Sequence, residues 1–207
     1  IRRPPRSTPS NSSAASDVYK RQIKFFIYLV LYMTLHIVVY VVVFSLLSLS
    51  ISFPSSNILL INSIQYFDRN ELAKLLDLRV EDIAVIEGSI ITYYALSLKS
   101  PKYEMIVIIA HGSGNTISTT DEVSLMKMII HGPAALFRLL TVLYVPSENK
   151  YYYAFTAQYF KYLFNPKTEK VIIISCDVDE LIHILKSKGY EVYLSTTPKP
   201  LHEIIRG

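Results

Sequence analysis

Short apolar runs rich in Val and Ile recur along the chain, and they limit its fold more than any other feature. The two most apolar are MIVIIA at 105–110 and VIIIS at 171–175. Runs of this kind indicate strands that are buried on both faces, which is typical of a parallel sheet. Parallel strands need long crossover connections, so helices are expected between them.

Segments with helical spacing do alternate with the strand-like runs. Asp68 can cap the first expected helix, Asp177 or Asp179 can cap the last, and Gly189 can end it. We therefore predict an α/β fold with a mostly parallel sheet and helices on both faces. The expected strands are 58–64, 82–88, 105–110, 171–175 and 190–196, and the expected helices are 69–78, 89–98, 154–164 and 179–188.

A long uncharged stretch precedes this pattern. From Phe25 to Phe53 the chain has no Asp, Glu, Lys or Arg. This exceeds the roughly 20 apolar residues that span a membrane, whereas the apolar core of a cleaved signal peptide has only about 7–15. We therefore predict a transmembrane helix at 23–53, a linker at 54–57 and one α/β domain at 58–207. Lys24 lies before the span and Arg69 is the next basic residue after it, which favours an extracytoplasmic domain in a single-pass membrane protein.

Residues 1–22 differ in composition from the rest and resemble a translated sequencing adaptor. The alternative is a basic leader rich in Ser and Pro, and either way we expect disorder. This segment holds five of the 21 basic residues and one of the 17 acidic residues, so the remainder has 16 of each. Because no excess of Lys and Arg is left, we do not expect nucleic acid as a partner.

The segment 115–153 is the least regular part of the expected domain. Part of it, 123–145, is apolar enough to suggest a second span, but Lys127, His131, Pro133 and Arg138 interrupt it. A second span would also separate the strands on its two sides into different compartments. We therefore expect a β-hairpin or a partly exposed insertion.

Two residues with catalytic chemistry follow the two most apolar strands. His111 follows the strand at 105–110, and Cys176, the single cysteine, follows the strand at 171–175. Ligands and catalytic groups of α/β sheets gather beyond the carboxyl ends of such strands. A Cys and a His that are distant in sequence form a candidate nucleophile and base. The rival histidine, His131, also precedes a glycine, but the strand order favours His111.

The order of these elements resembles the caspase-like fold, which includes caspases, legumain, gingipains, clostripain-type peptidases and CHAT domains. The resemblance rests on IVIIAHGSGN, on VIIISCD and on the helix FTAQYFKYLFNPKTEK before the latter. It implies a cysteine peptidase with a Cys176–His111 dyad and no cofactor, acting on a peptide or protein substrate. Together with the expected span, this predicts a membrane-anchored enzyme whose other partner is the lipid bilayer. The resemblance also implies an oxyanion site at the backbone N–H groups of Gly112 and Cys176. Asp177 departs from the family, which often has Gly, Glu or Arg after the cysteine, and we expect a substrate pocket near Asp177 and Ser113.

Other readings of these residues remain open. Cys176 can be an inert core residue, and the domain can be a catalytically silent module that binds partners at a membrane. HGSG also occurs in α/β-hydrolases, but their G-x-S-x-G motif is absent.

No histidine pair has metal-ligand spacing, and no Walker or Rossmann glycine pattern occurs. His36 falls in the expected span, His183 in a helix and His202 in a tail. After the fifth strand the chain ends early, which either shortens the fold or reflects a truncated sequence.

Overall fold

The computed structural model describes residues 12–64 and 68–206. The chain divides into two compact units, Ile1–Val39 and Tyr40–Gly207. The helices are α1 (Ser12–Ser50), α2 (Arg69–Leu75), α3 (Ile90–Lys99), α4 (Leu125–Leu136), α5 (Ala157–Tyr162), α6 (Asp179–Ser187) and α7 (Leu201–Arg206), with a short 3-10 turn at Val80–Asp82. The strands are β1 (Ile58–Asn62), β2 (Ile83–Glu87), β3 (Met105–Ile109), β4 (Gly112–Ser113), β5 (Thr116–Glu122), β6 (Leu140–Val145), β7 (Lys150–Thr156), β8 (Lys170–Ile174) and β9 (Glu191–Ser195).

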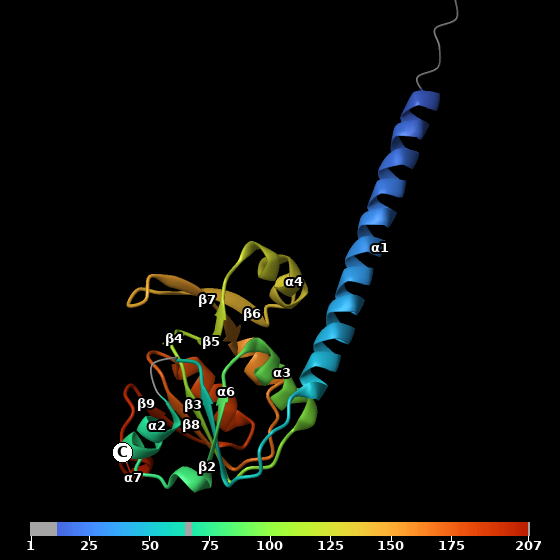
Figure 1. Cartoon of the computed structure of the whole chain (residues 1–207). Coiled ribbons are helices and arrows are strands. Elements are labelled where there is room, and N and C mark those ends of the chain that lie inside the picture. The colour runs from blue at the N-terminus through green and yellow to red at the C-terminus, as the bar shows by residue number, and fades with distance from the viewer. Residues whose placement is uncertain (1–11, 65–67, 207) are drawn as a thin grey trace, which may run out of the picture. The chain divides into compact units, whose positions relative to one another are not determined.

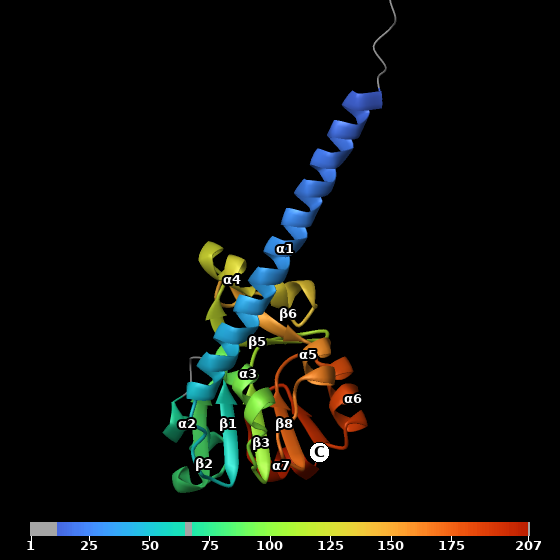
Figure 2. The ribbon, with the colours of Figure 1, turned by 90° about the vertical axis from the view of Figure 1, so that its right-hand side faces the viewer.

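Five strands form a parallel sheet in the order β2-β1-β3-β8-β9 (Figures 1 and 2). Every neighbouring pair in this sheet is parallel, which confirms the predicted α/β fold and its five strand-like runs. Alternate residues of the central strands point to opposite faces, as strand geometry requires. Ile106 and Ile108 belong to one apolar core, and Val107 and Ile109 belong to the other.

Helices cover both faces of the parallel sheet. One core holds buried side chains of α3, α5 and α6, such as Tyr93, Phe160 and Leu181. The opposite core holds Leu72 of α2 and Ile204 of α7. Both faces of the central strands are therefore buried, which explains why their sequences are apolar without alternation.

The segment between β3 and α5 forms a second, antiparallel sheet in the order β4-β5-β7-β6, with α4 inserted after β5. In Figure 1, α4 and the β6–β7 hairpin stand beyond one end of the parallel sheet. The hairpin that we expected is present, and the apolar segment 123–145 is divided between α4 and β6. It is therefore not a second continuous span among the described residues.

Local capping was only partly predicted. Asp68 caps α2 in a capping box with Glu71, and Gly189 follows α6 with a left-handed φ of 92°, both as expected. Neither Asp177 nor Asp179 caps α6, whose N-cap is Val178 without a side-chain hydrogen bond. The prediction of that cap was wrong.

Two element boundaries were also wrong. Residues 154–156 end β7 instead of beginning a helix, because their backbone pairs with β6 and β5. The expected tail around His202 is helix α7, which buries Leu201 and Ile204 against the sheet. Tertiary burial decided both cases, since neither segment has a strong local signal.

Helix α1 begins before the predicted span and ends at Ser50, short of the expected end at residue 53. Residues 1–11 of the expected artefact lie outside the described residues, and Ser12–Gln22 are part of α1. Among the described residues, α1 contains the one helix segment, Tyr19–Ser50, that is long and apolar enough to cross a membrane. By its length and composition, and by its place near the N-terminus, this helix has the character of a membrane anchor or of a signal sequence.

Candidate active site

His111 and Cys176 lie at the same edge of the parallel sheet, as we expected from the strand order. β3 ends at Ile109 and β8 ends at Ile174, and these two residues are register partners. The pairing continues one residue further, because the Ala110 N–H donates to the Ile174 carbonyl at 3.2 Å. His111 and Cys176 therefore follow adjacent strands at the same distance from the register pair.

Gly112 brings the loop after β3 against the backbone of the loop after β8. A Cβ atom on Gly112 would lie 2.6 Å from the Cys176 carbonyl oxygen and 2.2 Å from Ser175 Oγ. It would also lie 2.6 Å from Cγ1 of Val178. Contacts this short exclude any side chain, so glycine is needed here for the close approach of two loops.

Asp177 ties the same two loops together. One of its carboxylate oxygens accepts a hydrogen bond from the Gly114 N–H at 3.2 Å. Its backbone is left-handed, with a φ of 44°, a conformation that Asp tolerates better than most residues. The Asp177 carboxylate thus links the two loops by a hydrogen bond, and it does not cap α6. Its expected role in a substrate pocket, like that of the exposed Ser113, stays a prediction.

The His111 imidazole has a carboxylate partner that we did not predict. Its Nε2 atom lies 2.8 Å from Glu148 Oε1, with 28% of the His111 side chain and 13% of the Glu148 side chain exposed. The Tyr152 hydroxyl donates to the other oxygen of Glu148. A carboxylate at one ring nitrogen fixes the ring orientation and leaves the other nitrogen to accept a proton.

Glu148 was missed because it belongs to the β6–β7 turn, far from both candidate residues in sequence. Its only local signal is the turn sequence Pro146-Ser147-Glu148-Asn149 between two strand-like runs, with Asn149 at a φ of 54°. This signal marks a hairpin but not where its tip lies. The register of β7 with β5 places Tyr152 opposite Glu122, and the Glu148 side chain reaches the His111 ring from the turn before β7.

The backbone of His111 is held by Ser118 of β5. The His111 N–H donates to Ser118 Oγ at 3.1 Å, and the Ser118 N–H donates to the His111 carbonyl at 2.8 Å. Ser118 is itself buried. The second sheet therefore fixes both the main chain and the ring of this histidine.

His131 occupies a different kind of environment. It is 6% exposed, and its ring packs against Tyr153 at a centroid distance of 4.9 Å and against Phe44 at 5.2 Å. Its Nδ1 atom has no hydrogen-bond partner among the described residues. Burial lowers the pKa of His131, although the charge of Asp121 opposes this effect. These features describe a core histidine of α4, away from the sheet edge.

Cys176 is exposed at the sheet edge as a free thiol. The other two histidines of the domain lie elsewhere: His183 is exposed on α6, and His202 Nδ1 lies 3.8 Å from Asp77 Oδ2. Within the described part of the chain, no three His, Cys, Asp or Glu side chains are grouped to hold a metal ion.

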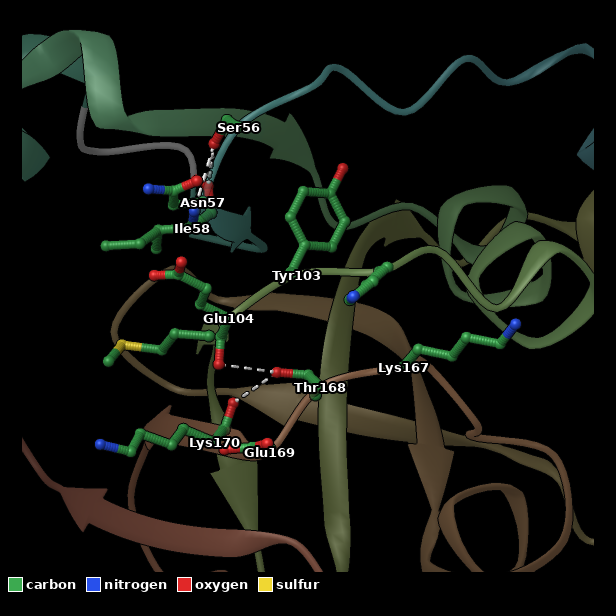
Figure 3. Close-up of a pocket in the computed structure, with 11 residues that line it drawn as sticks. Ser56, Asn57, Ile58, Tyr103, Glu104, Lys167, Thr168, Glu169 and Lys170 are labelled. Carbon is green, nitrogen blue, oxygen red and sulfur yellow. Dashed lines mark hydrogen bonds between the residues drawn. The ribbon is translucent and has the colours of Figure 1, made fainter.

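A cavity of about 710 Å³ opens at the opposite edge of the sheet, where the strands begin (Figure 3). Ile58, Met105 and Lys170, the first residues of three strands, line it together with the 102–104 and 167–169 segments. The Thr168 hydroxyl bridges two backbone carbonyls there, those of Glu104 and Lys170. This cavity lies away from His111 and Cys176, so it is not part of the predicted site.

Comparisons of the chain with protein-family models, with curated proteins and with solved structures give no match.

Proposed function

We propose that this protein is a membrane-anchored cysteine peptidase of caspase-like type. The observation that carries the proposal is the register of β3 and β8, which brings His111 and Cys176 to the same sheet edge. The element order, with a histidine strand, an antiparallel insertion, a helix and a cysteine strand, is the order on which the resemblance rests. The exposed thiol favours a reactive cysteine over a core residue.

In the proposed reaction, Cys176 Sγ attacks the carbonyl carbon of the scissile peptide bond. The thiol proton passes to His111, and His111 then gives it to the leaving amine as the C–N bond breaks. Water hydrolyses the resulting thioester, which releases the acid and restores the thiol. Backbone N–H groups of Gly112 and Cys176 would stabilise the oxyanion, each worth about 3–4 kcal/mol.

Glu148 acts in this proposal as a positioning residue. It contacts the His111 ring, and the Tyr152 hydroxyl orients it in turn. A carboxylate in this position also stabilises the imidazolium that forms when the histidine takes up the thiol proton.

The proposed site can be tested by labelling the full chain in detergent with a peptidyl acyloxymethyl ketone. Because the chain has one cysteine, every covalent adduct reports on Cys176. We expect Cys176→Ala to abolish labelling and His111→Ala to slow it by about 100-fold or more. His183→Ala, an exposed histidine on α6, is the matched control and should label at the normal rate. Equal labelling of the His111 and His183 variants would refute the dyad.

The proposed anchor is α1, with the domain on the extracytoplasmic side. Its support is the length and low polarity of Tyr19–Ser50. In cells, the full chain should stay in the membrane fraction after carbonate extraction, and external protease should cleave the domain only if it lies outside. Release by carbonate would argue against the anchor.

A catalytically silent interaction module is the second candidate. The cavity at the amino ends of the strands favours it, because a binding surface there would not use His111 or Cys176. Normal binding of a membrane partner by the Cys176→Ala variant, together with no peptide labelling of the wild type, would select this candidate.

A further inference from the structure

Helix α4 carries apolar side chains on its solvent side that its own domain does not cover. Leu125 is 78% exposed and Phe137, the residue that ends the helix, is 60% exposed. Met126, Met128 and Leu136 are exposed as well. The buried residues of α4 are His131, Pro133 and Ala134, which pack into the domain, whereas none of the residues 125–130 is buried. A cluster of exposed large apolar side chains on one element marks an interaction site.

The position of α4 identifies what covers this face. The buried His131 ring contacts the last turns of α1, at centroid distances of 5.2 Å from Phe44 and 6.2 Å from Tyr40. The Tyr40 hydroxyl is hydrogen-bonded to the Tyr94 hydroxyl of α3, which fixes this end of α1 on the domain. Lys99, at the end of α3, donates to the Leu49 and Ile51 carbonyls. Helix α4 therefore lies directly beside the emerging end of the apolar helix.

The length of the apolar helix agrees with this arrangement. Its 32 residues from Tyr19 to Ser50 extend about 48 Å at ~1.5 Å per residue, against a hydrocarbon thickness of ~30 Å. The surplus is long enough for the segment from Tyr40 onward to leave the bilayer while it packs on the domain. An element beside that segment lies at the level of the lipid headgroups.

The charges of α4 also fit a membrane surface. Lys127 is the one charged residue within the helix, and it pairs with Asp121 at 3.0 Å instead of interrupting the apolar face. Arg138 follows directly after Phe137, where its long side chain can reach the headgroups. A helix that is held on its domain by a few buried residues and exposes apolar side chains can lie in the interfacial plane of a bilayer.

We propose that α4 lies in the membrane interface, with the side chains of Leu125, Met126 and Phe137 inserted among the lipids. This inference rests on the proposed anchor, because α1 would bring α4 to the bilayer. It makes the domain a surface-docked module with a fixed orientation, instead of one that swings freely on a tether.

Tryptophan fluorescence offers a direct test, because the 207-residue sequence contains no Trp. Phe137→Trp and Met126→Trp each introduce one probe on α4. Leu35→Trp introduces a probe in the middle of the apolar helix, and Tyr162→Trp introduces one at an exposed site of α5. Each full-length variant is reconstituted into phosphatidylcholine vesicles with or without brominated acyl chains, which quench fluorophores in contact with them. Circular dichroism checks that each variant folds.

We expect about twofold quenching of the Phe137→Trp and Met126→Trp probes and none at Tyr162→Trp. No quenching of the two α4 probes overturns the proposal, and so does a blue-shifted but unquenched α4 probe, which would indicate a second copy or another protein on this face. The Leu35→Trp probe reports separately on the anchor. If it alone is quenched, the anchor holds and the α4 proposal fails; if it is not quenched, the proposed anchor itself fails.

Discussion

Two His-Gly pairs in this protein occupy opposite environments. His111-Gly112 lies where two sheets meet, with a carboxylate on its ring and a glycine pressed against another loop. His131-Gly132 lies in a helix, with a ring buried among aromatic side chains and a glycine that has open space around it. The same dipeptide therefore lies at a sheet edge beside a carboxylate in one region and in an aromatic core in the other, and only the surroundings distinguish them.

The comparison predicts that alanine at His131 lowers the free energy of unfolding much more than alanine at His111 does. His131→Ala should lower the free energy of unfolding by about 3 kcal/mol, because it empties a buried aromatic site. His111→Ala should change it by less than about 0.5 kcal/mol, since the partly exposed ring contributes little packing. Urea unfolding of the detergent-solubilised chain measures both. A larger loss of stability for His111→Ala would make that histidine a structural residue.

The two glycines should respond to alanine in opposite directions. Gly112→Ala should cost about 2 kcal/mol, because its Cβ overlaps Ser175, Cys176 and Val178. Gly132→Ala should stabilise α4 by up to about 1 kcal/mol, because alanine is a better helix former and nothing lies within reach of its Cβ. Thermal unfolding distinguishes the two. Equal effects would mean that the loops at the sheet edge are not in close contact.

Removing the carboxylate at His111 should have a smaller effect on reactivity than removing the ring. We expect Glu148→Gln to slow labelling by the peptidyl probe about tenfold, because the amide holds the ring but cannot stabilise its charged form. Glu122→Gln, which alters a surface carboxylate paired with Lys150, is the matched control and should leave the rate unchanged. An unchanged rate for Glu148→Gln would remove Glu148 from the proposed site.

The smallest expected difference concerns pH. Burial lowers the pKa of His131 in the folded protein, so the unfolded chain binds its proton more readily. This contribution to stability is complete above the ordinary pKa of about 6.5 and is lost as the pH falls below it. In a series from about pH 8 to pH 5, His131→Phe should lose less stability than the wild type. Identical profiles would show that His131 does not carry the effect.

The parallel sheet was predictable because each of its strands carries its own evidence. A run such as MIVIIA is apolar throughout and is shorter than a typical helix. Its local composition and length therefore identify it as a buried strand. The register of β3 with β8 follows once both are buried in one sheet. That is why the neighbourhood of His111 and Cys176 was expected before the structure.

The insertion was far less predictable. Residues 154–156 look like the start of a helix, yet they pair in β7. Helix α7 is only six residues long, too short for a periodic apolar pattern. The hydrogen bond by which Asp177 links the two loops is made to Gly114, which lies 63 positions away in the chain. Non-local partners of this kind leave no periodic signal in a single sequence.

The sequence by itself determined the parallel sheet, the long apolar helix and the two strands that end near His111 and Cys176, because burial on both faces requires continuous apolar runs. Only the tertiary structure brought Glu148 to His111, placed His131 among aromatic rings and left the apolar residues at both ends of α4 exposed. Those features arise from the packing of segments that are distant in the chain, and packing selects among side chains that local patterns treat as equivalent.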